Sequence, residues 1–136
     1  MTQTPIDSLD IFISATLGKK AKHPVVLDVR NLTSIADAFV ICSGSSNRQV
    51  TAIAEHIQRE LKTQKIHPLS VDGIKDGHWV LLDYGHIIIH VFYDPIRSFY
   101  DLEGLWSDAK RVGIESLAAF TDSDSADDDI EEYIIE

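Results

Sequence analysis

GHWVLLDYGHIIIHVFYDPIRSFYDLEGLW (Gly77–Trp106) decides the fold of this chain and holds seven of its eleven aromatic residues. Its first half predicts two adjacent strands, Trp79–Asp83 and His86–Phe92, joined by a tight turn at Tyr84–Gly85. No group of residues in it is typical of catalysis, and its many large apolar side chains do not suit a solvated edge. The stretch therefore favours a surface that binds a macromolecule.

The two strands of this hairpin carry apolar side chains on both faces, so both faces must be covered. After the second strand, Pro95 begins a helical turn and Tyr100–Arg111 is expected to form a second short helix. Two interpretations of the covering remain open. Either this C-terminal helical segment covers the second face, or a second protein does, as another copy of the chain or a different partner.

The residues before the hairpin predict two helices and three further strands. A helix over 5–20 follows from Ile6, Leu9, Ile13 and Leu17, with Thr4 able to cap it, and a second helix runs from the turn at 44–47 to about Lys65. The strands are expected at Val25–Arg30, Ala38–Ser43 and Pro68–Val71. The order α-β-β-α-β-β-β-α predicts an α/β (α+β) fold: a mixed sheet of about five strands with flanking helices.

Length and composition indicate a single domain over residues 1–120, followed by an acidic tail at 121–136 that is expected to be disordered. The longest apolar run is far shorter than the ~20 residues that cross a bilayer. The first ten residues, MTQTPIDSLD, lack the basic start of a signal peptide. A single cysteine, Cys42, excludes an internal disulfide, so we expect a cytoplasmic protein.

The net charge of −10 is concentrated at the C-terminus. Residues 122–136 contain eight acidic residues and no Lys or Arg; removing those eight from the 22 acidic residues leaves 14 against 12 basic ones. Neither part has the basic surface of a protein that grips phosphates. A basic protein partner fits this charge, whereas direct nucleic acid binding as the main activity does not.

GSSNRQV (Gly44–Val50), between a strand and a helix, is the nearest feature to a catalytic motif, because such a turn can bind a phosphate. Nucleotidyltransferases begin this way, but they also need paired carboxylates on the next strand. Only Asp72 or Asp83 could serve, and no such pair follows. A simple helix cap is the alternative, and nucleotide and Mg²⁺ titration by calorimetry would separate the two.

Metal and thiol chemistry find little support in the sequence. His86 and His90 are predicted to lie on one face of a strand, but about 13 Å apart, which is too far to share an ion. The other four histidines show no ligand spacing. Cys42 lies within an apolar strand and is interpreted as a buried structural thiol. We expect no metal, no cofactor and no enzymatic activity.

Three blocks of the sequence, in this order and spacing, closely resemble the ribosomal silencing factor (RsfS, or Iojap) family. They are DAFVICSGSSNRQV (37–50), WVLLDYG with HVF (79–85 and 90–92), and RSFYDLEGLW (97–106). The resemblance covers about Ile6 to Lys110. It implies a nucleotidyltransferase-like fold without the catalytic carboxylates, and a protein that is often a homodimer when free.

The same resemblance implies a repressor of translation under nutrient limitation. It would bind the large ribosomal subunit through large-subunit ribosomal protein fourteen and block joining to the small subunit. An assembly factor for the large subunit would share this docking surface, and sequence does not separate the two. The partner-binding residues carried over from the matching blocks are Trp79, Tyr84, His90, Arg97, Tyr100 and Glu103. Trp79 on its own fits either a core residue or an interface anchor.

Overall fold

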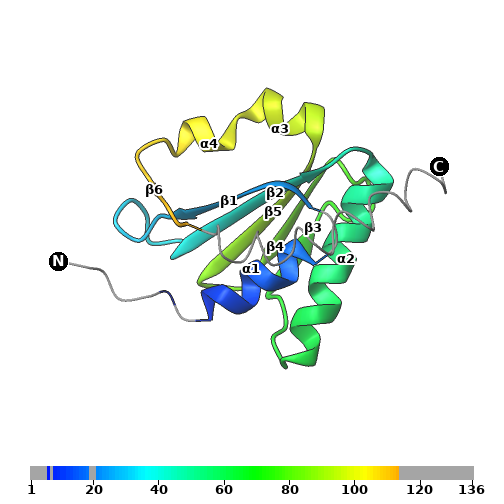
Figure 1. The fold of residues 1–136 in the computed structure, drawn as a ribbon, viewed down its shortest axis with the longest axis horizontal. Helices are drawn as coiled ribbons and strands as arrows, with labels where there is room; N and C mark the ends of the chain where they lie inside the picture. Colours follow the sequence, from blue (N-terminus) through cyan, green and yellow to red (C-terminus); the bar gives the residue numbers. More distant parts are fainter. Residues whose placement is uncertain (1–5, 7, 19–20, 114–136) are drawn as a thin grey trace.

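The protein folds around one six-stranded mixed sheet with helices on both faces (Figure 1). The computed structural model describes residues 6, 8–18 and 21–113. The strands lie in the order β3-β4-β5-β2-β1-β6. Their bounds are β1 Lys22–Asp28, β2 Ala38–Gly44, β3 Ser70–Asp72, β4 Trp79–Asp83, β5 Ile87–Tyr93 and β6 Lys110–Arg111. The helices are α1 Leu9–Leu17, α2 Asn47–Thr63, α3 Asp94–Tyr100 and α4 Leu102–Leu105.

The two central strands, β2 and β5, pair in parallel, and every other pair in the described sheet is antiparallel. Gly44 at the end of β2 lies opposite Tyr93 at the end of β5. The chain therefore leaves β2 and β5 at the same edge of the sheet, towards α2 and α3 respectively. The predicted hairpin is confirmed: Gly85, with φ 92°, makes the turn between β4 and β5.

Helix α2 forms where the sequence predicts it. Ser46 caps it by accepting a hydrogen bond from the backbone N–H of Gln49 at 3.1 Å. Its apolar stripe faces the sheet and consists of the five expected residues, Val50, Ile53, Ala54, Ile57 and Leu61. Helices α1 and α2 together close one face of the sheet, which we call the helix-packed face.

The opposite face lies beneath α3 and α4 and has its own apolar cluster, which includes Leu27, Phe39, Ile41 and Phe92. The C-terminal helical segment therefore covers part of the second face, as one of the two interpretations of the hairpin expected. We call this side the aromatic face, after the rings described below.

The prediction of a helix over Tyr100–Arg111 is wrong. Asp101 adopts a left-handed conformation (φ 46°) that ends α3, and α4 then lasts for only four residues. Lys110 and Arg111 instead form a strand that pairs with Asp28 and Leu27 of β1. Within the described residues the sheet has six strands rather than about five, and the predicted order of elements gains a helix and a strand at its end.

Two other expectations concern the ends of the chain. Helix α1 begins at Leu9, where Ser8 precedes it with φ 61°, and the predicted start at Pro5 lies outside the described residues. The acidic segment at 121–136 also lies outside them. No helix in the described part of the chain is long and apolar enough to cross a membrane.

Candidate docking face

Six aromatic rings gather on the aromatic face and contact one another. Trp79 of β4 stacks on Phe92 of β5 with ring centroids 4.8 Å apart, and it contacts Tyr100 of α3 at 5.0 Å. Phe39 of β2 contacts Trp106 at 5.1 Å and His90 at 5.3 Å. This cluster of rings is what brings Trp79, His90 and Tyr100 together from three elements.

A partly buried hydrogen bond joins two of the predicted residues. The indole Nε1–H of Trp79 donates to Nδ1 of His90 at 3.1 Å, so the neutral imidazole carries its proton on Nε2. That atom is buried and has no partner among the described residues. His90 is only 6% exposed, and burial lowers its pKa to about 4. His90 therefore acts as a neutral core group that orients the Trp79 ring.

The outer side of α3 and α4 presents apolar side chains to solvent. Phe99 is 77% exposed, Tyr100 53% and Leu105 76%. We call these three residues the ridge. The rings of Phe99 and Tyr100 are in contact, with centroids 5.1 Å apart. Contiguous exposed apolar groups mark interaction surfaces more often than isolated ones do. The surrounding charges at 94–108 are acidic except for Arg97: Asp94, Asp101, Glu103 and Asp108.

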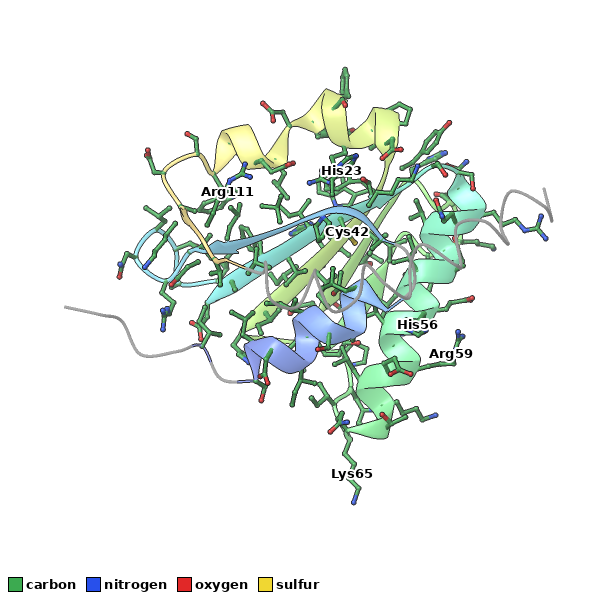
Figure 2. The ribbon with its side chains drawn as sticks, viewed as in Figure 1. His23, Cys42, His56, Arg59, Lys65 and Arg111 are labelled. Atoms are coloured by element: carbon green, nitrogen blue, oxygen red, sulfur yellow. The ribbon has the colours of Figure 1, made fainter. Side chains whose placement is uncertain are left out.

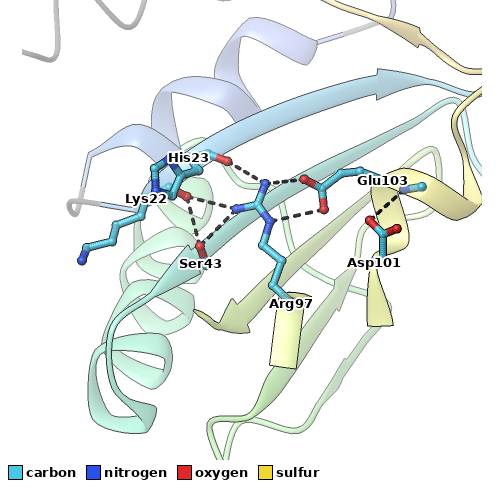
Figure 3. Close-up of polar contacts among 7 residues, drawn as sticks. Lys22, His23, Ser43, Arg97, Asp101 and Glu103 are labelled. Atoms are coloured by element: carbon cyan, nitrogen blue, oxygen red, sulfur yellow. Dashed lines mark hydrogen bonds and ion pairs between the residues drawn. The ribbon is translucent and has the colours of Figure 1, made fainter. Parts of the chain in front are cut away.

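Arg97 and Glu103 form an ion pair beneath the ridge (Figure 3). Nη2 of Arg97 lies 2.9 Å from Oε2 of Glu103, and Nε donates to Oε1 at 3.3 Å. Burial alone would raise the pKa of Glu103, but the hydrogen bond and charge of Arg97 outweigh it, so that pKa lies below its usual value. The pair links α3 to α4 across the turn at Asp101.

Tyr84 lies apart from the other five predicted residues. It is buried on the helix-packed face, where its ring contacts Phe12 of α1 at 5.2 Å. Burial raises the pKa of its hydroxyl to about 12. The structure thus brings Trp79, His90, Arg97, Tyr100 and Glu103 to one side of the sheet and places Tyr84 on the other.

The structure does not bring together the residues that a nucleotidyltransferase would need, which are the Gly44–Val50 turn and Asp72 or Asp83. Asp83 lies at the opposite end of the sheet from Gly44, and its Oδ1 accepts a hydrogen bond from the backbone N–H of Gly85. Asp72 lies on β3, three strands away from β2, or about 14 Å. In the Gly44–Val50 turn, Ser45 Oγ donates to Oε1 of Gln49 at 2.8 Å. The turn therefore works as a helix cap.

The histidines and Cys42 show no reactive arrangement. His86 precedes β5 and its ring contacts Phe12, whereas His90 faces the other side, so the prediction that they share a face is wrong. The strand begins only at Ile87, which breaks the alternation that the prediction assumed. Burial raises the pKa of Cys42 to about 12 in the middle of the sheet (Figure 2). Within the described residues, no three potential ligands gather to hold a metal ion.

Sequence reasoning missed the outward position of Phe99 and Leu105. Both belong to the third matching block, but a single continuous helix would have put them in different positions relative to Tyr100. The break at Asp101 was the missing information. The nearest signal in the sequence is Asp101 itself, because an aspartate can cap the start of a helix by accepting a hydrogen bond from the backbone N–H three residues later, here that of Gly104.

Comparison with known proteins gives this arrangement a family. Residues 2–133 match the family described as "Ribosomal silencing factor during starvation", which extends the match into the acidic segment. Over 109 residues the chain is 38% identical to the ribosomal silencing factor RsfS of Halalkalibacterium halodurans, covering 80% of this chain and 93% of that protein.

The chain is also similar to a solved structure and to a more distant relative. The crystal structure of a Chromobacterium violaceum protein superposes with a TM-score of 0.70 at 36% identity, covering 72% of this chain and 82% of the other. The mouse protein named "Mitochondrial assembly of ribosomal large subunit protein 1" is 28% identical over 102 residues, or 73% of this chain and 45% of that protein. The chain belongs to the family of ribosomal silencing factors.

Proposed function

We propose that this protein represses translation by binding the large ribosomal subunit on the face that meets the small subunit. Binding there blocks subunit joining sterically, mainly when nutrients are short. Family membership supports the link to the ribosome. The observation that carries the proposal is the ridge, which continues the half-buried Trp79 into a solvent-exposed apolar surface.

The proposed contact on the large subunit is ribosomal protein fourteen. A typical protein interface buries about 800 Å² on each partner and depends on a few aromatic anchors near its centre. Trp79 and Tyr100 fit that role, with Phe99 and Leu105 beside them. The acidic residues around the ridge would favour a basic protein surface and speed the encounter. Steric blocking needs no chemistry, so the protein would act in the cytoplasm without cofactor or catalysis.

The free protein is proposed to form a homodimer that covers the same apolar surface. An exposed patch of Phe99, Tyr100 and Leu105 in a free monomer would otherwise favour nonspecific association. Sedimentation velocity at micromolar concentration tests this: a dimer that a Leu105→Ser change converts to monomer is expected. A monomer that does not change over the concentration range would contradict it.

The test of the proposed function is co-sedimentation with isolated large subunits, followed by a subunit-joining assay. The wild-type protein should move with large subunits and reduce their joining to small subunits. A Trp79→Ala variant should lose both activities, and its circular dichroism must first show that it is folded, because removing a buried tryptophan can cost ~3–5 kcal/mol. Wild-type protein that stays at the top of the gradient would overturn the proposal.

A second candidate function is assistance in assembling the large subunit. The name of the mouse relative is the observation in its favour. Such a factor would use the same docking surface on precursors of the subunit. Ribosome profiles of a deletion strain through growth separate the two functions. Precursors that accumulate during fast growth would support assembly, whereas excess joining only in starved cells would support silencing.

A further inference from the structure

Arg97 uses all of its hydrogen-bonding capacity within the chain. A guanidinium group has five N–H donors, and each of them has an acceptor here. Beyond the two bonds to Glu103, Nη1 donates to the carbonyl of Lys22 at 3.3 Å and to Oγ of Ser43 at 3.1 Å, and Nη2 donates to the carbonyl of His23 at 2.8 Å (Figure 3). Arg97 has no donor left to offer a partner.

The acceptors come from elements far apart in the sequence. Ser43 is fully buried on β2, while Lys22 and His23 lie at the irregular start of β1, where the pairing with β2 shifts register. His23 has φ 49°, an unfavourable conformation for a residue other than glycine, and its carbonyl is one of those that Arg97 binds. Arg97 therefore fastens α3 to both β1 and β2.

The same guanidinium also bridges the two helices that carry the ridge. Glu103 lies on α4, so the ion pair closes the corner at Asp101, whose carboxylate also accepts a hydrogen bond from the N–H of Gly104 at 3.2 Å. Tyr100 is three residues after Arg97 on α3, which places it near the same turn of the helix. Because α3 is held on the sheet, the ring of Tyr100 rests against Trp79.

We propose that Arg97 and Glu103 are positioning residues, which hold Tyr100 against Trp79 and do not themselves contact the ribosome. This changes the role expected for them from the sequence, and it rests on the proposed function of the same surface. A partly buried ion pair adds little net stability, but it can fix one arrangement when all its donors are satisfied. The function of the pair is then to preorganise a binding surface.

The binding experiment compares Arg97→Lys with wild type on large subunits. Lysine keeps the charge but is a compact point donor, which cannot bridge Glu103 and two carbonyl groups at once. Affinity should fall roughly tenfold, with the salt dependence of the association rate unchanged. Arg30→Lys is the matched control, because Arg30 also forms an ion pair with a carboxylate. Its Nη2 lies 2.7 Å from Oδ2 of Asp28 on β1. This variant should bind like wild type.

A double-mutant cycle decides between positioning and contact. If Arg97 acts through Tyr100, adding Arg97→Lys to a Tyr100→Ala protein should weaken binding by less than roughly twofold. If the two changes are additive, Arg97 contacts the partner and the proposal is overturned. Glu103→Gln, which puts a donor opposite Nη2, provides a second variant should Arg97→Lys fail to fold.

A measurement without ribosomes keeps the inference separate from the proposed function. The indole N–H of Trp79 gives its own resonance in a ¹H–¹⁵N spectrum, assigned with Trp106→Phe. Arg97→Lys and Glu103→Gln should move it in the direction that Tyr100→Ala does, and Arg30→Lys should leave it in place. An unmoved resonance overturns the positioning role. Absence of wild-type binding to large subunits overturns only the proposed function.

Discussion

The two faces of the sheet are built from different side chains, although the same strands form both. The helix-packed face is mainly aliphatic, with Phe12 and Tyr84 as its aromatic residues; among its fully buried side chains are Ile53, Ile57, Leu82, Ile87 and Ile89. The aromatic face contains rings, a histidine and an arginine, and two short helices cover it only in part. Burying aliphatic groups stabilises the fold, whereas aromatic side chains are enriched at the centres of binding surfaces. If the proposed function is right, stability and recognition are separated across one sheet.

Damage to the helix-packed face should have the largest effect, and it should be an effect on stability. Phe12 is 1% exposed and packs against Tyr84, so Phe12→Ala is expected to lower the free energy of unfolding by about 3–5 kcal/mol. Urea denaturation measures this. The protein that remains folded should still bind large subunits with wild-type affinity. A loss below ~1 kcal/mol would show that this face is not the stabilising one.

The buried histidine should make the aromatic face sensitive to acid. The pKa of His90 is about 6.5 when unfolded and about 4 when folded, because burial disfavours the charged form. As the pH falls, His90 is therefore protonated in the unfolded state before it is protonated in the folded state. The free energy of unfolding then decreases as the pH falls from about 6.5 towards 4. The loss approaches about 3 kcal/mol.

Replacing His90 with asparagine, which can still accept from the Trp79 indole, tests this dependence. Unfolding free energies measured between pH 7 and pH 4 should fall less steeply for His90→Asn than for wild type. Parallel curves for the two proteins would mean that His90 does not titrate in this range.

A change on the ridge should weaken binding while leaving stability alone. Leu105→Ser removes an exposed apolar group, so the unfolding free energy should change by no more than ~0.5 kcal/mol. Affinity for large subunits should fall by about 1–2 kcal/mol. Leu69→Ser is a closely matched control, because both leucines are 76% exposed and Leu69 lies beside the outer strand β3. Equal loss of affinity in the two variants would argue against the ridge as the contact.

The smallest expected effect is at the corner between α3 and α4. Asp101→Ala removes the cap on Gly104 and should lower the melting temperature by the equivalent of about 1 kcal/mol. Asp101→Gly also loses the cap, but glycine adopts the left-handed conformation readily. The net loss of stability should therefore be only a few tenths of a kcal/mol. Differential scanning calorimetry compares the two. A larger loss for glycine would mean that the corner is held by something other than the backbone.

The sequence predicted most of the sheet and both long helices, because their apolar periodicity depends on neighbouring residues. Val50, Ile53 and Ile57 predict the buried side of α2 directly. The two-residue strand β6 could not be predicted in this way. Lys110 and Arg111 are a strand only because the chain returns beside β1, and nothing in their own identities favours one.

The six residues carried over from the matching blocks remain a prediction as a binding site, and the sequence foresaw only some of their positions. Trp79 and Tyr100 were chosen from the matching blocks, and they do contact each other. Tyr84 was chosen in the same way but lies on the opposite face, because alternation along a strand that is apolar on both faces does not say which helices cover which face. The arginine contacts could not be predicted at all, since Arg97 bonds to residues from positions 22, 23 and 43.

The parallel pairing of β2 with β5 has a consequence for synthesis. Ala38 pairs with Ile87 and Gly44 pairs with Tyr93, so the centre of the sheet cannot form until β5 has been synthesised. While the chain is nascent, the edge of β2 is an unpaired apolar strand of the kind that promotes aggregation. Fragments that stop before Ile87 should therefore be insoluble, and folding should be slow because its central contacts are distant in sequence. A protein that acts on ribosomes thus acquires its sheet only late in its own translation.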